Sequence, residues 1–212
     1  MEVLSVSCKS WVAAPHMPTE YKLSSVIDLA LPELKIIKPR RFEDARGFFM
    51  ETYSRRALAA EGITGDFVQD NHSRSNSAGT VRGLHFQVPP FAQTKLVRCS
   101  AGRIFDVAVD IRRGSPSYGR HVAVELSAEN GRQLLIPAGF AHGFATLEPG
   151  TELQYKVTAD YSPAHDAGIF WNDAALAIPW PVDPASVVLS DKDRKLPLLS
   201  EFTSPFEYPG RM

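Results

Sequence analysis

Cysteine is nearly absent from this sequence. The 212 residues include only Cys8 and Cys99, which are too few and too far apart for a disulfide framework or a cysteine zinc site. We therefore expect two reduced thiols in a cytoplasmic protein. No apolar run approaches the roughly 18 residues that a membrane-spanning helix needs. The first residues lack the basic start and long apolar block of a secretory signal, so neither a membrane anchor nor export is expected.

An excess of charge of either sign is also lacking. Lysine and arginine number 23, and aspartate and glutamate 24, so the formal net charge is −1. This balance gives no general attraction to nucleic acid or to acidic membranes, and we expect neither as a partner. A local cluster of cations would have to hold any anionic ligand. Charged residues at 22% and hydrophobic residues at 44% form an ordinary globular mixture without the signature of disorder.

Long helical patterns are missing too, and short apolar segments lie between 16 prolines and 14 glycines. This punctuation is typical of a sandwich or barrel. In RIFDVAVDIR, residues 103–112, four apolar side chains alternate with Asp106, Ala108 and Asp110, which predicts a strand. Further strands are expected in TKLVRCSAG, HVAVELS, RQLLIPAG, HGFATLE and ELQYKVTA. We predict one all-β domain, residues 24–212, after a poorly defined N-terminal extension, residues 1–23.

Two short segments favour helix. SRRALAAEG begins with Ser54 as a candidate N-cap and ends at Gly62 as a stop signal. LSDKDRKLPLLSEF, near the end of the chain, is the second candidate.

Two histidines have unusual surroundings. VRGLHFQ carries His85, and IPAGFAHGF carries His142 between glycines. The spacing Pro137-x-Gly139-x-x-His142 resembles the second motif of the cupin superfamily, whose members are jelly rolls of the double-stranded β-helix type.

The metal ligands of that superfamily are incomplete here. Metal-binding cupins have His-x-His and a nearby Glu in their first motif. The matching residues are His85-Phe86-Gln87, and no Glu or His follows through Lys95. Two scattered histidines hold a divalent ion poorly, and a nearby lysine cation opposes it. We therefore predict that no metal is bound.

A lone histidine on a strand is more often a satisfied core residue than a catalyst. The arginine, glycine, glutamine and lysine within ten positions set His85 apart from that case. No role is assigned to His16, His121 or His165.

An ordered set of motifs resembles one family. The motifs are FEDARGFFMETY, FVQDNHSRS, VRGLHFQ, QTKLVRC, GRIFDVAVDIRRGSPSYG, IPAGFAHGF, YKVTADY, GIFWND and LSDKD, and they cover about residues 32–200. Together they are similar to the dTDP-4-dehydrorhamnose 3,5-epimerases. The resemblance implies a cupin-type jelly roll that uses neither metal nor cofactor. It also implies a homodimer in which N-terminal strands join the partner's sheet.

The resemblance further implies that C3 and C5 of a dTDP-4-keto-6-deoxyhexose are inverted on the route to dTDP-L-rhamnose. Both carbons lie next to the C4 carbonyl, so inversion needs a base, a stabilised enolate and an acid on the opposite face. Histidine suits the base because its ordinary pKa is near 6.5. By resemblance His85 is the base, and Asp193 orients its ring. Lys95 is the cation near the keto oxygen, and Tyr155 is the acid.

The remaining substrate contacts also come from the resemblance. Around the nucleotide sugar it places Arg46, Glu51, Gln69, Asn71, Arg82, His142, Asp166 and Lys192. It places Tyr161 in a stack on thymine. Phe48 and Trp171 are expected as walls, although each could equally belong to a core. In a homodimer, some of these contacts would come from the partner chain.

Several alternatives stay open. By spacing alone, Tyr155 indicates a core aromatic, Asp193 a surface helix charge and Lys95 a solvated strand end. A relative with the same motifs could invert only C3 or only C5 of a dTDP-4-keto-deoxysugar in a secondary-metabolite pathway. A cupin could also bind a nucleotide sugar without turnover.

Overall fold

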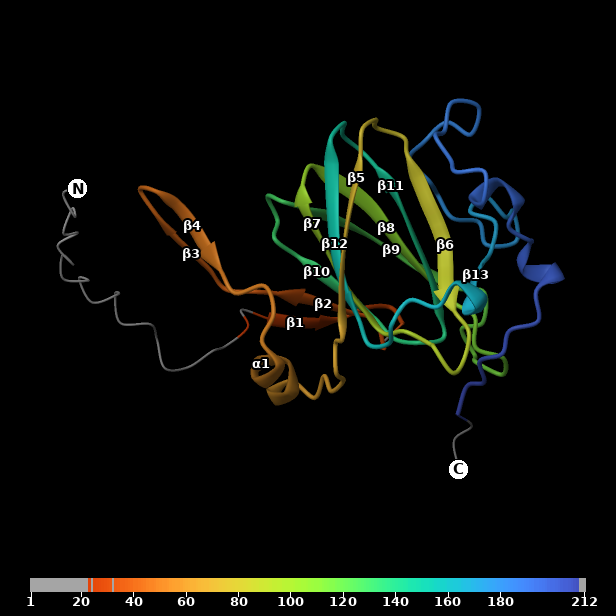
Figure 1. The fold of residues 1–212 in the computed structure, drawn as a ribbon, viewed down its shortest axis with the longest axis horizontal. Helices are drawn as coiled ribbons and strands as arrows, with labels where there is room; N and C mark the ends of the chain where they lie inside the picture. Colours follow the sequence, from red (N-terminus) through yellow and green to blue (C-terminus); the bar gives the residue numbers. More distant parts are fainter. Residues whose placement is uncertain (1–22, 24, 32, 210–212) are drawn as a thin grey trace, which may run out of the picture.

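The computed structural model describes residues 23, 25–31 and 33–209, and these form two facing antiparallel sheets (Figure 1). The six-stranded sheet has the order β1 (Ser25–Asp28), β2 (Lys35–Lys38), β10 (Gln133–Ile136), β7 (Lys95–Ala101), β12 (Thr151–Val157) and β5 (Gln69–Ser75). The five-stranded sheet has the order β13 (Asp166–Gly168), β6 (Val81–Gln87), β11 (Phe140–Thr146), β8 (Arg103–Asp110) and β9 (His121–Ser127). The prediction of an all-β protein is confirmed.

The main hydrophobic core lies between the two sheets. The six-stranded sheet contributes Ile36, Val97, Cys99, Leu134, Ile136 and Leu153, and the five-stranded sheet contributes Ile104, Ala108, Val122, Leu126, Phe140 and Phe144. These residues follow the period of two by which alternate side chains of a strand reach one face.

A second core covers the outer face of the five-stranded sheet. Val107 and Val109 of β8 pack there with Leu84 of β6, beneath a C-terminal segment that includes Trp180 and Phe202. The predicted alternation in β8 is therefore present, but both of its faces are buried. Asp106 and Asp110 lie on the face that looks inward, and both are fully buried.

One α-helix lies on the outer face of the six-stranded sheet. It is α1 (Arg55–Ala60), and the Ser54 side chain caps it by accepting from the Ala57 N–H, as the sequence predicted. Leu58 packs on Ile37 and Leu96 of the sheet. The second helix candidate forms two 3-10 turns, η2 (Asp193–Lys195) and η3 (Leu199–Glu201), because Pro197 interrupts an α-helix. Another turn, η1 (Pro163–His165), precedes β13.

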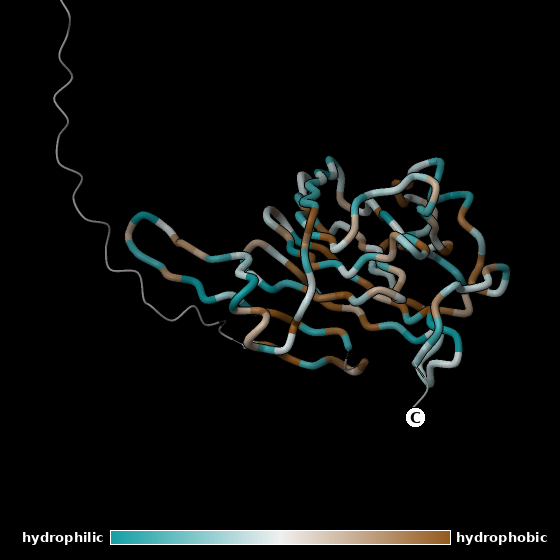
Figure 2. The backbone as a smooth tube through the Cα atoms, turned by 60° about the horizontal axis from the view of Figure 1, so that its bottom comes forward, coloured by the Kyte–Doolittle hydropathy of each residue, from teal (hydrophilic) through white to brown (hydrophobic). Residues whose placement is uncertain are grey.

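A separate hairpin leaves the two-sheet body. Its strands are β3 (Arg41–Asp44) and β4 (Gly47–Met50), and it projects away from both sheets (Figures 1 and 2). Phe48 and Phe49 are more than half exposed, at 55% and 54%. Exposed aromatic side chains on a projecting hairpin are suited to contact with another surface.

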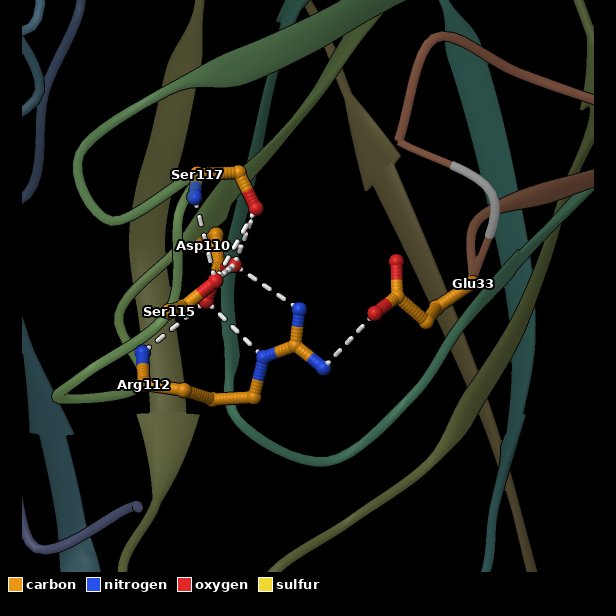
Figure 3. Close-up of polar contacts among 5 residues, drawn as sticks. All are labelled: Glu33, Asp110, Arg112, Ser115 and Ser117. Carbon is orange, nitrogen blue, oxygen red and sulfur yellow. Dashed lines mark hydrogen bonds and ion pairs between the residues drawn. The ribbon is translucent and has the colours of Figure 1, made fainter. Parts of the chain in front are cut away.

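A buried polar cluster ties the end of β8 to the β1–β2 connection (Figure 3). Arg112 forms two hydrogen bonds to the Asp110 carboxylate, at 2.9 and 2.8 Å, and reaches Glu33 at 3.2 Å. The hydroxyls of Ser115 and Ser117 also donate to Asp110. Burial alone would raise the pKa of Asp110, but these donors bring it below its usual value.

Within the described part of the chain, no helix has the length and apolar character needed to cross a membrane. The predicted extension, residues 1–23, lies outside the described residues apart from Leu23.

Candidate functional site

A cavity of about 410 Å³ opens between the two sheets. Its walls come from β6 and β11 of one sheet, from β5, β7 and β12 of the other, and from a C-terminal segment that ends at η2. Its lining residues are Ser73, Thr80, Val81, Arg82, His85, Lys95, His142, Phe144, Leu153, Tyr155, Val188, Leu189, Ser190, Lys192 and Asp193. All four residues predicted as catalytic therefore line one cavity.

His85 and Asp193 form a hydrogen-bonded pair in the wall of this cavity. Nε2 of His85 lies 2.6 Å from the Asp193 carboxylate, and the Asp193 side chain is only 4% exposed. Burial raises the pKa of Asp193, but the hydrogen bond and charge of His85 outweigh it and the net pKa is lowered. The carboxylate therefore stays ionised and fixes the orientation of the imidazole. Nδ1 is the ring nitrogen that remains available to take up a proton.

Lys95 is the first residue of β7 and is almost fully buried, with 8% exposure. Its Nζ donates to the backbone oxygen of His85 at 3.2 Å. Burial lowers the pKa of Lys95 to about 8, and the charges of Asp106 and Asp166 oppose the shift. At neutral pH the amine is still mostly a cation, desolvated and in contact with the backbone of His85.

A second histidine–aspartate pair lies deeper. Nε2 of His142 is 2.7 Å from Oδ1 of Asp106, while Oδ2 of Asp106 has no hydrogen-bond partner in the described structure. Burial lowers the pKa of His142, although the Asp106 charge acts the other way. Sequence reasoning assigned Asp106 no role. The available signal was a carboxylate on the inward face of β8, between core residues Ile104 and Ala108.

Close contact between β6 and β11 brings the two histidines together. His142 pairs with His85 across these strands. A Cβ on Gly83 would lie 2.5 Å from the Cα of Gly143, so only glycine fits at this crossing. The two glycines thus allow both imidazoles to line one cavity.

Tyr155 lines the opposite wall, on β12 of the six-stranded sheet. Burial raises the pKa of its phenol, so the hydroxyl keeps its proton over the neutral range. Arg82 comes from the same sheet as His85 and donates to the Ser75 hydroxyl at 3.3 Å. An acid and a base on facing walls are the arrangement that inversion of a carbon centre needs.

A linked group of polar residues lies beside the four residues predicted as catalytic. The Tyr161 hydroxyl donates to Asp166 at 2.9 Å, and Lys192 forms an ion pair with the same carboxylate. Gln69 donates to Asn71 at 2.7 Å and accepts from the Tyr161 N–H at 2.9 Å. The hydrogen bond to Asp166 raises the pKa of Tyr161, whose ring is mostly exposed. This group offers an aromatic face and a cation to a ligand that extends from the cavity.

Eight predicted substrate residues do not line the cavity: Gln69, Asn71, Tyr161 and Asp166, described above, and Arg46, Phe48, Glu51 and Trp171. Arg46 and Phe48 lie on the projecting β3–β4 hairpin, and Glu51 follows it. The Arg46 side chain is 87% exposed and pairs with Asp44. Trp171 is 2% exposed and packs in a core with Val81 and Ala145, so in this chain it forms no wall of the cavity.

No group of three or more His, Cys, Asp or Glu residues in the described ranges is arranged to hold a metal ion. The Gln87 side chain, at the position of a cupin ligand, is buried and bonds to backbone groups instead. Metal independence stays a prediction.

Comparisons with a family model and with known proteins identify the same family. Residues 28–201 match the family model described as dTDP-4-dehydrorhamnose 3,5-epimerase. The enzyme of that name from Sinorhizobium fredii is 53% identical over 180 residues, which are 85% of this chain and 92% of the relative.

Solved structures give the same result. The Bacillus anthracis dTDP-4-dehydrorhamnose 3,5-epimerase, crystallised with TDP and PPi, is 54% identical with a TM-score of 0.80, over 82% of this chain and 98% of that one. The Legionella pneumophila dTDP-6-deoxy-D-glucose-3,5-epimerase, in complex with dTDP-4-keto-L-rhamnose, is 46% identical with a TM-score of 0.83, over 88% and 99%. The predicted cupin-type jelly roll is confirmed by these likenesses.

Proposed function

The chain belongs to the dTDP-4-dehydrorhamnose 3,5-epimerase family, and we propose on this basis that it converts dTDP-4-dehydro-6-deoxy-D-glucose to dTDP-4-dehydro-L-rhamnose. The reaction is an epimerisation at C3 and C5 in dTDP-L-rhamnose biosynthesis. One observation carries the proposal for the site: the His85–Asp193 pair and Tyr155 stand on opposite walls of the same cavity.

Proton removal is assigned to His85. The C–H bonds at C3 and C5 are acidic because the C4 carbonyl takes up the electron pair as an enolate. Asp193 holds the imidazole ring and stabilises the imidazolium that forms when the proton arrives. Asp193 therefore acts through His85 and does not itself receive the proton.

Enolate stabilisation is assigned to Lys95. A desolvated ammonium group interacts more strongly with a developing negative oxygen than a solvated one does, because the local dielectric is low. The burial of Lys95 beside the His85 backbone provides that setting.

Reprotonation from the opposite face is assigned to Tyr155. Its phenol is protonated at neutral pH and can donate to the enolate carbon; the phenolate then regains a proton from solvent, and His85 releases its proton to solvent. Delivery by Tyr155 inverts the centre, whereas return of the proton by His85 retains it.

The nucleotide end is assigned to the polar group outside the catalytic cluster. Tyr161 stacks on thymine, while Arg82 and Lys192 supply cations for the diphosphate. Gln69, Asn71, His142 and Asp166 complete the polar contacts to the nucleotide sugar.

A homodimer accounts for the residues on the hairpin. Arg46, Phe48 and Glu51 lie away from the cavity of their own chain, on or beside a projecting hairpin with an exposed aromatic surface. Because β1 and β2 pair within the sheet of their own chain, we propose that the exchanged N-terminal strands are β3 and β4, so that this hairpin completes the partner's site. We also propose that the enzyme is cytoplasmic.

NMR of the reaction in deuterated water tests this function. Wild-type protein should incorporate deuterium at both C3 and C5 and invert both centres, and His85→Ala should do neither. Exchange at one carbon only would indicate a C3 or C5 monoepimerase. Nucleotide binding without any deuterium uptake would indicate a non-catalytic cupin.

A further inference from the structure

Three glutamine side chains hold the loop that carries Tyr161. Gln93 donates to the Ala159 carbonyl at 2.7 Å, and Gln69 accepts from the Tyr161 N–H at 2.9 Å. The third is Gln87, which is 3% exposed and makes three hydrogen bonds with its amide. Because several side-chain amides bond to its backbone, this loop has one defined backbone conformation.

Gln87 brackets Tyr161 on both sides. Its Nε2 donates to the carbonyl of Asp160 at 3.1 Å, and its Oε1 accepts from the N–H of Ser162 at 2.6 Å. Its second N–H donates to the carbonyl of Phe91 at 2.9 Å, in the turn after β6. One buried amide therefore fixes the backbone immediately before and immediately after Tyr161.

The position of Gln87 in the fold links this loop to the catalytic strand. Gln87 is the last residue of β6, two residues after His85, and strand alternation directs both side chains to one face. It also pairs directly with Asp166 of β13, the carboxylate that accepts from the Tyr161 hydroxyl. Contacts at the end of β6 thus hold the backbone on either side of Tyr161 directly, and its hydroxyl through Asp166.

The chemistry of the amide explains why glutamine is required there. Two backbone carbonyls need donors and one backbone N–H needs an acceptor, and only a neutral amide of this length supplies both. Methionine has a similar shape but would leave these buried groups unpaired. Glutamate would keep the acceptor for Ser162 but would face two carbonyls with negative charge.

We propose that Gln87 is a positioning residue that holds Tyr161 and Asp166 for binding of the nucleotide and takes no part in proton transfer. This inference rests on the proposed function, because it uses the assignment of Tyr161 to the thymine base. Gln87 contributes to substrate affinity through Tyr161, while the spacing of His85, Lys95 and Tyr155 does not depend on it.

The test compares affinity with turnover. In Gln87→Met, the Kd for dTDP by calorimetry and the KM for substrate should both rise about 10- to 100-fold, the effect of unpairing buried hydrogen-bonding groups. The kcat should fall less than about threefold. Gln93→Met is the matched control, because Gln93 bonds to the same loop at Ala159 but not beside Tyr161, and it should weaken dTDP binding less. Thermal melting checks that each variant is folded.

A double-mutant cycle with Tyr161→Ala decides whether Gln87 acts through Tyr161. If it does, Gln87→Met should cause little further loss of dTDP affinity in the Tyr161→Ala background. Additive losses, or equal falls in kcat and kcat/KM, would overturn the inference. Gln87→Glu provides the same readouts if Gln87→Met does not fold. Failure of the proposed function would look different, since wild-type protein would then fail to bind dTDP or to invert the sugar.

Discussion

At the scale of single residues, two histidine–aspartate pairs have nearly equal Nε2–Oδ1 distances but different surroundings. The His85 side chain is 30% exposed to the cavity, whereas the His142 side chain is 8% exposed and its pKa is lowered by burial. A base has to take up a proton and release it again, which the more accessible imidazole does more readily. The deeper imidazole stays neutral and is suited to hydrogen bonding with the substrate.

Removing the Tyr155 hydroxyl should separate proton abstraction from inversion. In Tyr155→Phe the base, the Lys95 cation and most of the aromatic packing remain, so the enolate should still form. Deuterium should then enter at C3, C5 or both with retained configuration, while the inverted product falls steeply, in an NMR assay in deuterated water. Near-normal inversion, or a parallel loss of exchange and inversion, would remove Tyr155 from the catalytic residues.

Lys95 should set an alkaline limit on activity. Its folded pKa of about 8 means that the amine loses its charge as pH rises through that value, so kcat/KM should fall there. Lys95→Arg keeps its charge at all accessible pH values, so its pH profile should lack this alkaline fall in kcat/KM. A wild-type profile that stays flat to pH 9 or above, about one unit past this pKa, would contradict the assigned role.

The lowered pKa of Lys95 should also affect stability, which changes with pH in the opposite direction to activity. Between about 8 and the ordinary value of 10.5, the unfolded chain holds a proton that the folded chain has released. The contribution of Lys95 to the free energy of unfolding therefore rises with pH across this window.

Residue-level prediction from sequence had a clear limit. Ser54 was identified as a cap because the signal is local. For Trp171 a cavity wall and a core position were both left open, since an aromatic residue has the same sequence signature in both places, and it lies in a core. Asp106 and Gln87 were given no role because their partners are defined by contacts across the fold.

At the scale of elements, short apolar segments between turn residues, with period-two alternation in β8, predicted β7 to β12 correctly but did not reveal what covers them. β8 was recognised as a strand, yet its outer face is buried by a C-terminal segment more than 60 residues later, which no local pattern indicates. Strands β1 to β4 are only four residues each, too short to show a periodic signal.

The buried Arg112–Asp110 pair should make a large contribution to the stability of β8 and its surroundings. Arg112→Leu removes the paired cation and leaves the buried carboxylate with two hydroxyls and the backbone N–H of residue 112 as donors, which should cost about 3–5 kcal/mol in the free energy of unfolding. Arg113→Leu is the matched control, because its ion pair with Glu207 is exposed and should be worth about 0–1 kcal/mol. Urea titration measures both, and equal small losses would show that the cluster contributes little.

At the scale of the whole molecule, the projecting hairpin predicts complementation between defective chains. In a mixture of His85→Ala and Arg46→Ala refolded together, half of the dimers should be mixed. The hairpin of the His85→Ala chain would then supply Arg46 to the intact base of its partner. One site in each mixed dimer should work, giving about a quarter of wild-type activity. Activity no higher than the sum of the separate variants would place Arg46 in the site of its own chain.

The separation of His85 and Asp193 along the chain has a consequence during synthesis. Asp193 lies 108 positions after His85, on a turn within the segment that covers the five-stranded sheet. Because a ribosome releases the N-terminal part first, strands β1 to β12 can emerge and associate before Asp193 has been made. At that stage the two sheets therefore carry the His85 imidazole without the Asp193 carboxylate. Catalysis by this pair requires the covering segment to have docked, so enzymatic turnover reports on a step of folding later than the formation of the sheets.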